Sequence, residues 1–100
     1  MGFQVVISTL AKADLREITE YIAKDNPASA VRFANALLDE ALSLEQSPMR
    51  GSGLRRKPGV RRLVRSPYLI YYRVEEDTKT VQVLRFWHGA RHPKTPRFED

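Results

Sequence analysis

The sequence predicts an α+β fold of two layers, in which a helical hairpin covers one face of an antiparallel sheet. Residues 11–46 hold two amphipathic helical patterns, and residues 59–92 hold short runs of β-branched and aromatic residues separated by turn-forming residues. The breaks at 66–67 and 76–79 are too short for a parallel crossover and fit antiparallel hairpins. The expected order is one strand, two helices, then three or four strands.

The first predicted strand covers residues 3–8. Its side chains partly alternate in polarity, which places Phe3, Val5 and Ile7 on one face. Ser8 or Thr9 is suited to cap the next helix, because a hydroxyl can accept a hydrogen bond from the free amides of the first turn.

The first predicted helix covers residues 11–24. Apolar side chains recur there at helical spacing, at Ala11, Leu15, Ile18 and Ile22. The segment 25–27 ends this helix and starts another, since an asparagine suits the N-cap and a proline suits the first helical position.

The second predicted helix covers residues 28 to about 46. Its apolar stripe consists of Val31, Ala34, Leu38, Ala41 and Leu42, and it is broader than one contact with a sheet requires. We expect most of this stripe to form core by packing on the first helix. The alternative is that part of it forms a groove for a partner.

A loop follows at 47–53, and residues 54–57 can add a short strand before a turn at Pro58-Gly59. The domain is expected to cover 1–91. Residues 92–100 contain two prolines and few apolar residues, so we expect an extended or mobile tail.

Composition narrows the class of protein. The chain has no cysteine, so disulfides and thiolate metal sites are excluded, and a reducing cytoplasmic location fits. No segment reaches the 18 or so apolar residues of a membrane helix, and no signal peptide pattern occurs. A soluble, unprocessed domain is expected.

Charge is divided unequally along the chain. Residues 1–50 hold five Lys/Arg and seven Asp/Glu, a net −2, whereas residues 51–100 hold twelve and five, a net +7. We expect the arginines to occupy the sheet face that the helices leave open. Such a face indicates an anionic partner, either nucleic acid or an acidic protein; the alternative is a solvated surface that serves solubility.

Five motifs in this order resemble the RelE/ParE superfamily of type II toxins. They are Asp14-Leu15-x-x-Ile18-x-x-Tyr21-Ile22-Ala23, Asp25-Asn26-Pro27 with Ala30 and Phe33, Gly59-x-Arg61-x-Leu63, Tyr68-x-Ile70-x-Tyr72-Arg73-Val74 and Trp87-His88-Gly89-Ala90-Arg91. The resemblance implies a two-layer RelE-like fold and an antitoxin that keeps the toxin inactive. Antitoxins of the family add a strand to the sheet and lay a helix on the helical hairpin, where the resemblance implies contacts with Leu15, Ile22, Val31, Leu38 and Leu42.

The superfamily divides by target. RelE-like members are ribosome-dependent endoribonucleases, and ParE-like members block DNA gyrase. Metal-independent RNA cleavage needs a base, a cation and an acid, for which the candidates are His88, Arg61, Arg73 and Tyr68. Nuclease relatives often carry an arginine and a tyrosine where this chain has Tyr68 and Gly89, and residues 51–66 hold no carboxylate.

Because this nuclease set is incomplete, we predict a ParE-like gyrase inhibitor and not an enzyme. The alternatives are a metal-independent endoribonuclease and a degenerate, non-toxic member that only binds antitoxin. The predicted target-binding residues are Arg61, Arg65, Arg73, Arg85, His88 and Arg91. His88 also has a structural interpretation, at a strand end with one ring nitrogen bonded to backbone. No metal or cofactor is expected, because two histidines without a nearby carboxylate leave too few ligands.

Overall fold

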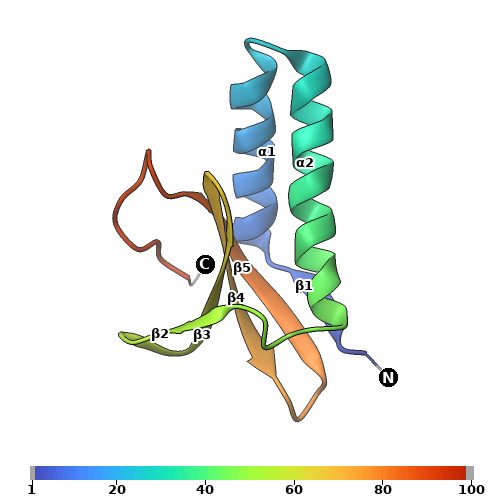
Figure 1. Cartoon of the computed structure of the whole chain (residues 1–100), viewed down its shortest axis with the longest axis vertical. Helices are drawn as coiled ribbons and strands as arrows, with labels where there is room; N and C mark the ends of the chain where they lie inside the picture. Colours follow the sequence, from blue (N-terminus) through green and yellow to red (C-terminus); the bar gives the residue numbers. More distant parts are fainter. Residues whose placement is uncertain (1, 99–100) are drawn as a thin grey trace.

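The computed structural model describes residues 2–98 and has the predicted order of elements (Figure 1). The elements are β1 (Gln4–Ile7), α1 (Thr9–Ala23), α2 (Pro27–Leu42), the 3₁₀ turn η1 (Ser43–Glu45), β2 (Ser52–Leu54), β3 (Lys57–Arg65), β4 (Tyr68–Glu75) and β5 (Thr80–His88). The predicted fold class, a helical hairpin over one face of a sheet, is therefore confirmed.

Both helices begin where the sequence predicts. The Ser8 hydroxyl accepts a hydrogen bond from the Ala11 amide at 3.1 Å, and it donates to the Leu84 carbonyl at 3.1 Å, which ties the start of α1 to β5. At α2 the side chain of Asn26 accepts from the Ser29 amide, and Pro27 occupies the first turn.

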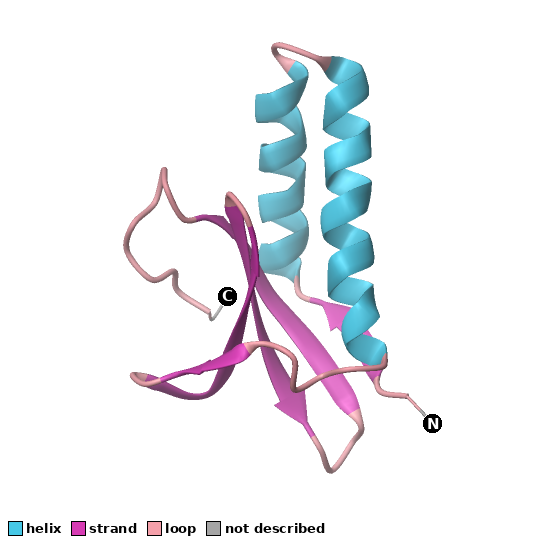
Figure 2. Ribbon diagram, in the orientation of Figure 1, coloured by secondary structure: helices cyan, strands magenta, loops and turns pink. Residues whose placement is uncertain are grey.

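The sheet has five strands in the order β1-β5-β4-β3-β2. β2 to β5 form an antiparallel meander, whereas β1 pairs with β5 in parallel. This parallel pair needs a long crossover, and the two helices supply it. Figure 2 shows both helices on one side of the sheet and extending beyond its edge.

Most of the core lies between the helices and the sheet. Ile18 and Leu37 from the helices pack with Ile70 and Phe86 from β4 and β5, and all four side chains are at most 4% exposed. A smaller cluster on the other sheet face contains Val60, Tyr71 and Leu84, with Leu69, Trp87 and Phe98 packed against it. The face expected to stay open is thus partly covered.

The predicted turn at Pro58-Gly59 is wrong. The chain reverses at Arg55-Arg56, because Leu54 pairs with Lys57, and Pro58 and Gly59 lie inside β3. Gly59 has a φ of 87°, and the register shifts between Gly53 and Leu54. The glycine therefore serves an irregular strand, where only a residue without Cβ adopts this angle at low cost.

The tail has no helix or strand in its described part, residues 92–98, but it is held against the sheet. Phe98 packs on Tyr71 with 5.2 Å between ring centroids, and the Trp87 indole nitrogen donates to the carbonyls of His92 and Lys94. One large apolar residue and two backbone acceptors are enough to attach it. The last two residues of the predicted tail, 99 and 100, lie outside the described range.

Candidate functional site

The candidate site lies at the end of β5. Tyr68 begins β4 and pairs with His88, the last residue of β5. Their rings meet edge to face, with 4.9 Å between centroids and an interplanar angle of 84°. The His88 Nδ1 atom accepts a hydrogen bond from the Arg91 amide at 2.9 Å. An imidazole that accepts at Nδ1 carries its proton at Nε2, so this bond assigns the tautomer.

Both polar rings of this pair are held in their neutral forms. Burial lowers the pKa of His88, and the positive charge of Arg91 lowers it further. Burial also raises the pKa of Tyr68, although the Arg91 charge partly opposes this. At neutral pH the site therefore presents an uncharged imidazole, whose Nδ1 lone pair is already used, and an uncharged phenol.

A pocket of about 240 Å³ opens beside this pair, between α1 and β5. Glu17, Arg85, Trp87, His88 and Arg91 are among the residues that line it. The Arg91 guanidinium lies over the Tyr21 ring, 4.0 Å from its centroid, as a cation–π pair. Arg91 is exposed, so its charge is available to an external partner.

Asp14 anchors the same region from α1. Its carboxylate accepts from Arg85 Nε at 2.7 Å and from Arg85 Nη2 at 2.8 Å, and it also accepts from the Phe86 amide at 3.1 Å. β1 ends opposite Val83, so the β5 edge beyond it has no strand partner and this carboxylate takes one edge donor. The hydrogen bonds from Asp14 raise the pKa of Arg85 above its ordinary value. Arg85 is therefore a fixed charge of the scaffold.

The predicted arginines do not share one sheet face. Arg61 and Arg65 lie on the helix side of β3: Arg61 donates to the carbonyls of Met49 and Gly51, and Arg65 pairs with Glu40 of α2 at 3.2 Å. Arg73 lies on the opposite face, beside Leu84 and Phe98 in a pocket of about 220 Å³. The expectation of a single arginine face is wrong, because alternation along β3 places Arg61 and Arg65 on the face that packs against α2 and the loop.

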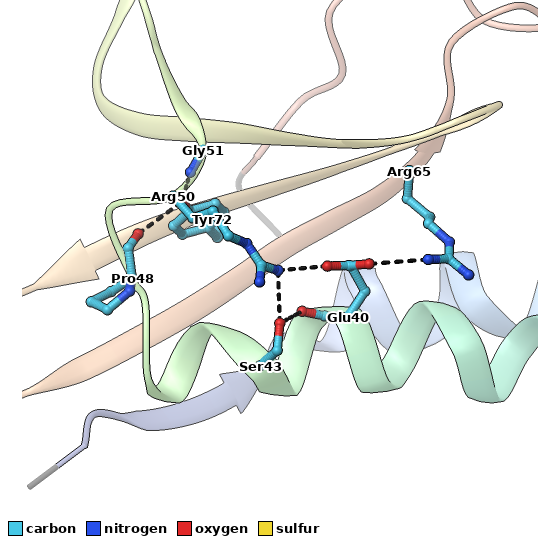
Figure 3. Close-up of polar contacts among 7 residues, drawn as sticks. All are labelled: Glu40, Ser43, Pro48, Arg50, Gly51, Arg65 and Tyr72. Atoms are coloured by element: carbon cyan, nitrogen blue, oxygen red, sulfur yellow. Dashed lines mark hydrogen bonds and ion pairs between the residues drawn. The ribbon is translucent and has the colours of Figure 1, made fainter.

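The 47–51 loop is held by a network between α2 and β4 (Figure 3). The buried Tyr72 hydroxyl donates to the Pro48 carbonyl at 2.7 Å and accepts from the Gly51 amide at 2.8 Å. Glu40 bridges Arg50 and Arg65, and Arg50 also donates to the Ser43 hydroxyl at 2.7 Å. Arg61 completes the network at the loop carbonyls, so its contacts are structural.

The four nuclease candidates are not brought together. Tyr68 and His88 meet at one end of the sheet, whereas Arg61 pairs with Tyr72, four residues along β4 and roughly 13 Å away along the strand. Arg73 faces the other side of the sheet from Tyr68. No group of three potential metal ligands occurs within the described part of the chain.

Sequence reasoning missed two residues that organise this region. Asp14 shares a helix face with Ala11 and Ile18, three and four residues away, and a carboxylate on an apolar stripe is a signal for a buried partner. Tyr72 was assigned to a strand, but its hydroxyl partners come from a loop that strand periodicity does not place. Asp14 was therefore detectable from the sequence and the Tyr72 contacts were not.

The predicted antitoxin-contacting residues divide into two groups. Val31 and Leu42 are 59% and 43% exposed on α2, and Leu38 beside them is half-buried. Leu15 and Ile22 instead pack against the core. Leu15 also borders a shallow groove of about 370 Å³ between the helices, together with Thr19 and Ala34. No helix in the described range is long and apolar enough to cross a bilayer.

Comparison with known proteins supplies the family context. The profile of the family described as ParE toxin of type II toxin-antitoxin system, parDE, matches residues 5–93. Toxin RelE2 of Caulobacter vibrioides is 38% identical over 88 residues, which cover 88% of this chain and 97% of that protein.

Solved structures share the fold. The toxin–antitoxin complex RelBE2 from Mycobacterium tuberculosis contains a chain with a TM-score of 0.69 and 30% identity, over 88% of this chain and 99% of that one. The chromosomal ParDE system of P. aeruginosa matches with a TM-score of 0.72 and 28% identity, over 86% and 95%. E. coli toxin RelE in the free state matches with a TM-score of 0.65 over 93% of this chain and 90% of that one, at 17% identity, a likeness of fold alone.

Proposed function

This chain belongs to the ParE toxin family of type II toxin–antitoxin systems, and we propose that it inhibits DNA gyrase in the cytoplasm and is neutralised by a cognate antitoxin. The observation that carries the choice of gyrase over RNA cleavage is the state of His88. Its Nδ1 already accepts the Arg91 amide and its pKa is lowered, so at neutral pH it offers neither a free basic nitrogen nor an imidazolium acid.

The position of the cations supports the same choice. A nuclease site needs a cation beside the acid and base to stabilise the phosphorane. Arg61 binds loop carbonyls and Arg85 binds Asp14, while Arg73 is on the far sheet face from Tyr68. Arg91 alone of these arginines is both exposed and adjacent to His88. One cation beside a neutral ring suits protein contact better than phosphoryl transfer.

An antitoxin partner is supported by the helix surface. Val31 and Leu42 are exposed on one face of α2, and the groove between α1 and α2 offers an adjacent apolar surface. A helix that lays apolar residues along this face would bury both. β1 is an edge strand of the sheet with an exposed Val6, which suits the addition of an antitoxin strand.

Two assays on the purified chain test the target. We expect inhibition of gyrase supercoiling and no cleavage of translated messenger RNA. Arg91→Ala should weaken inhibition by roughly tenfold, as expected for the loss of one charged contact at an interface, while Arg16→Ala, an exposed arginine on α1, should leave it unchanged.

Ribosome-dependent cleavage without an effect on gyrase would instead establish the RelE-like alternative, which the name of the C. vibrioides relative keeps in view. A third reading is a non-toxic member that only binds antitoxin. Normal growth of cells that express the chain without an antitoxin would favour that reading over both toxins.

A further inference from the structure

The β2–β3 hairpin reaches away from the helices (Figure 1). Leu54 pairs with Lys57, so Arg55 and Arg56 form a two-residue turn at its tip. Arg55, Arg56 and Lys57 are exposed, and so is Arg62, which pairs with Ser52 further along the hairpin. We name these four residues the basic arm.

No acidic residue balances the basic arm along the chain. Residues 46–74 contain eight Lys/Arg and no Asp or Glu. Three of the eight are already engaged: Arg50 and Arg65 with Glu40, and Arg61 with loop carbonyls. Among residues 2–98 the structure gives no ion pair to any member of the basic arm. Its four charges therefore remain for an external anion.

The positive charge continues onto the sheet face that the helices leave open. Arg62 is paired with Tyr71, and Arg73 is paired with Val60, so both arginines project from the same face as the Val60–Tyr71 cluster. Diagonal neighbours on paired strands lie about 7–8 Å apart. Arg62 and Arg73 thus form a row of charge that leads from the tip of the arm toward β4.

The chemistry of the arm distinguishes among anionic partners. A stable protein interface has an apolar core, yet the large exposed apolar residues of the described chain include none within residues 52–62. Single-stranded nucleic acid is bound by stacking on aromatic rings as well as by charge. The neighbouring rings cannot stack on bases, because Tyr71 and Tyr72 are at most 3% exposed. Contact with the phosphates of a duplex needs only cations and polar groups.

We propose that the basic arm binds the phosphate backbone of duplex DNA without reading its sequence. This activity goes beyond inhibition of gyrase and does not depend on it, because it uses a surface at the opposite strand from the His88 site. The arm brings four charges, with Arg73 as a fifth, into contact with phosphates and releases the counterions condensed on the duplex.

Fluorescence anisotropy with a labelled duplex of about 20 base pairs, over a range of salt from about 50 to 200 mM, tests the proposal. The triple variant Arg55→Gln/Arg56→Gln/Lys57→Gln should bind at least about tenfold more weakly at the lowest salt. Its dependence of log K on log salt should also be shallower by about 2 to 3, close to one per lost phosphate contact.

The matched control is Lys12→Gln/Arg16→Gln/Lys24→Gln, which removes the same net charge from exposed positions on α1 and its C-cap. It should keep most of the affinity and the wild-type salt dependence. Because the arm residues lie at an exposed turn, the triple variant should unfold at the wild-type temperature. If it does not fold, the single variant Arg56→Gln provides the test, with a decrease in slope of about one.

Three results would overturn the proposal. They are equal losses in the arm variant and the α1 control, tighter binding to a single-stranded RNA of equal length, and displacement of the duplex by polyglutamate at equal charge concentration. The first would mean that net charge alone attracts DNA. The second and third would identify a single strand or an acidic protein as the partner.

Discussion

At the residue scale, Asp14 is the clearest case of one side chain that supports a whole region. Its carboxylate holds the Arg85 guanidinium through two hydrogen bonds and also accepts the Phe86 amide. The side chains of Asp14 and Arg85 are only 9% and 14% exposed, so water replaces these contacts poorly. Arg85 in turn donates to the Arg97 carbonyl at 2.7 Å, which links the helix to the tail through one guanidinium.

Replacing Asp14 with alanine should therefore destabilise the fold strongly. Loss of one partner from a buried pair leaves an uncompensated charge, so we expect the free energy of unfolding to fall by about 3 kcal/mol. Asp14→Asn should cost less, because an amide oxygen can still accept one of the bonds. Denaturant unfolding measures both, with exposed Glu17→Ala as the control. A small effect of Asp14→Ala would show that the pair contributes little to the folded state.

His88 gives the molecule a defined response to pH. Its folded-state pKa lies below the ordinary value of 6.5, so between these two values the unfolded chain binds more protons than the folded chain. The free energy of unfolding should thus decrease as pH falls below about 6.5, and this contribution is fully lost below the folded pKa.

His88→Asn tests this response, because the asparagine oxygen can accept the Arg91 amide without titrating near neutral pH. Unfolding measured at about pH 7 and about pH 5 should show a smaller loss of stability in His88→Asn than in the wild type. An NMR titration of the His88 ring should also give a midpoint below 6.5. An identical pH dependence in the two proteins would contradict the assignment.

At the element scale, the loop between η1 and β2 depends on one hydroxyl. The Tyr72 ring is fully buried, and its oxygen satisfies both the Pro48 carbonyl and the Gly51 amide (Figure 3). A Cβ on Gly51 would come within 2.7 Å of that oxygen and of the Arg62 carbonyl. The glycine is therefore required for close approach of loop and strand.

Tyr72→Phe should loosen this loop while the sheet persists. It leaves a carbonyl and an amide without partners, at an expected cost of about 1–3 kcal/mol. Tyr21→Phe, which removes a hydroxyl from a ring that is 50% exposed, should change stability by less than about 0.5 kcal/mol. Hydrogen exchange at the Gly51 amide should accelerate in Tyr72→Phe only. Unchanged exchange there would mean that Arg61 and Arg50 hold the loop without the hydroxyl.

The elements that the sequence predicted well are those with a strong local pattern. Both helix starts follow from capping residues, and the turns at 66–67 and 76–79 separate strands as expected. The reversal at Arg55-Arg56 was missed because Pro58-Gly59 is a stronger turn signal, and it instead accommodates an irregularity of β3. The tail was missed because its attachment depends on Phe98 reaching Tyr71, a contact that no local pattern encodes.

The candidate site was predictable in its members but not in its geometry. His88, Arg91 and Tyr68 were named from the sequence and meet at the end of β5. The arginines of β3 were assigned to the wrong face, since strand alternation gives two faces and only packing decides which one meets the helices. Charge counted along the chain does not show which arginines Glu40 and the loop carbonyls already engage.

At the scale of the whole molecule, the proposed contact surfaces are separate. The exposed apolar residues Val31 and Leu42 lie on α2, the His88–Arg91 group lies at the end of β5, and the basic arm projects from the far edge of the sheet. A rigid core joins them, because the helix and sheet side chains between them are almost fully buried. Changes at one surface should therefore leave the others unaffected.

This separation predicts that neutralisation and toxicity can be uncoupled by substitution. Val31→Asp/Leu42→Asp places charge on the proposed antitoxin face, so it should weaken antitoxin binding by 100-fold or so, in line with the loss of two buried apolar contacts. The toxin itself should remain active, because neither residue contacts the β5 end. Arg91→Ala should show the reverse, with weaker gyrase inhibition and unchanged antitoxin binding.

Both variants should fold normally, since all three side chains are exposed. Growth of cells that co-express each variant with the antitoxin, together with calorimetric titration of the purified pairs, distinguishes the two effects. The helix variant should arrest growth even when antitoxin is present, whereas the Arg91 variant should be harmless with or without it. If both substitutions reduced antitoxin binding equally, the antitoxin would have to reach the β5 end as well, and neutralisation would then act by covering the proposed toxic site directly.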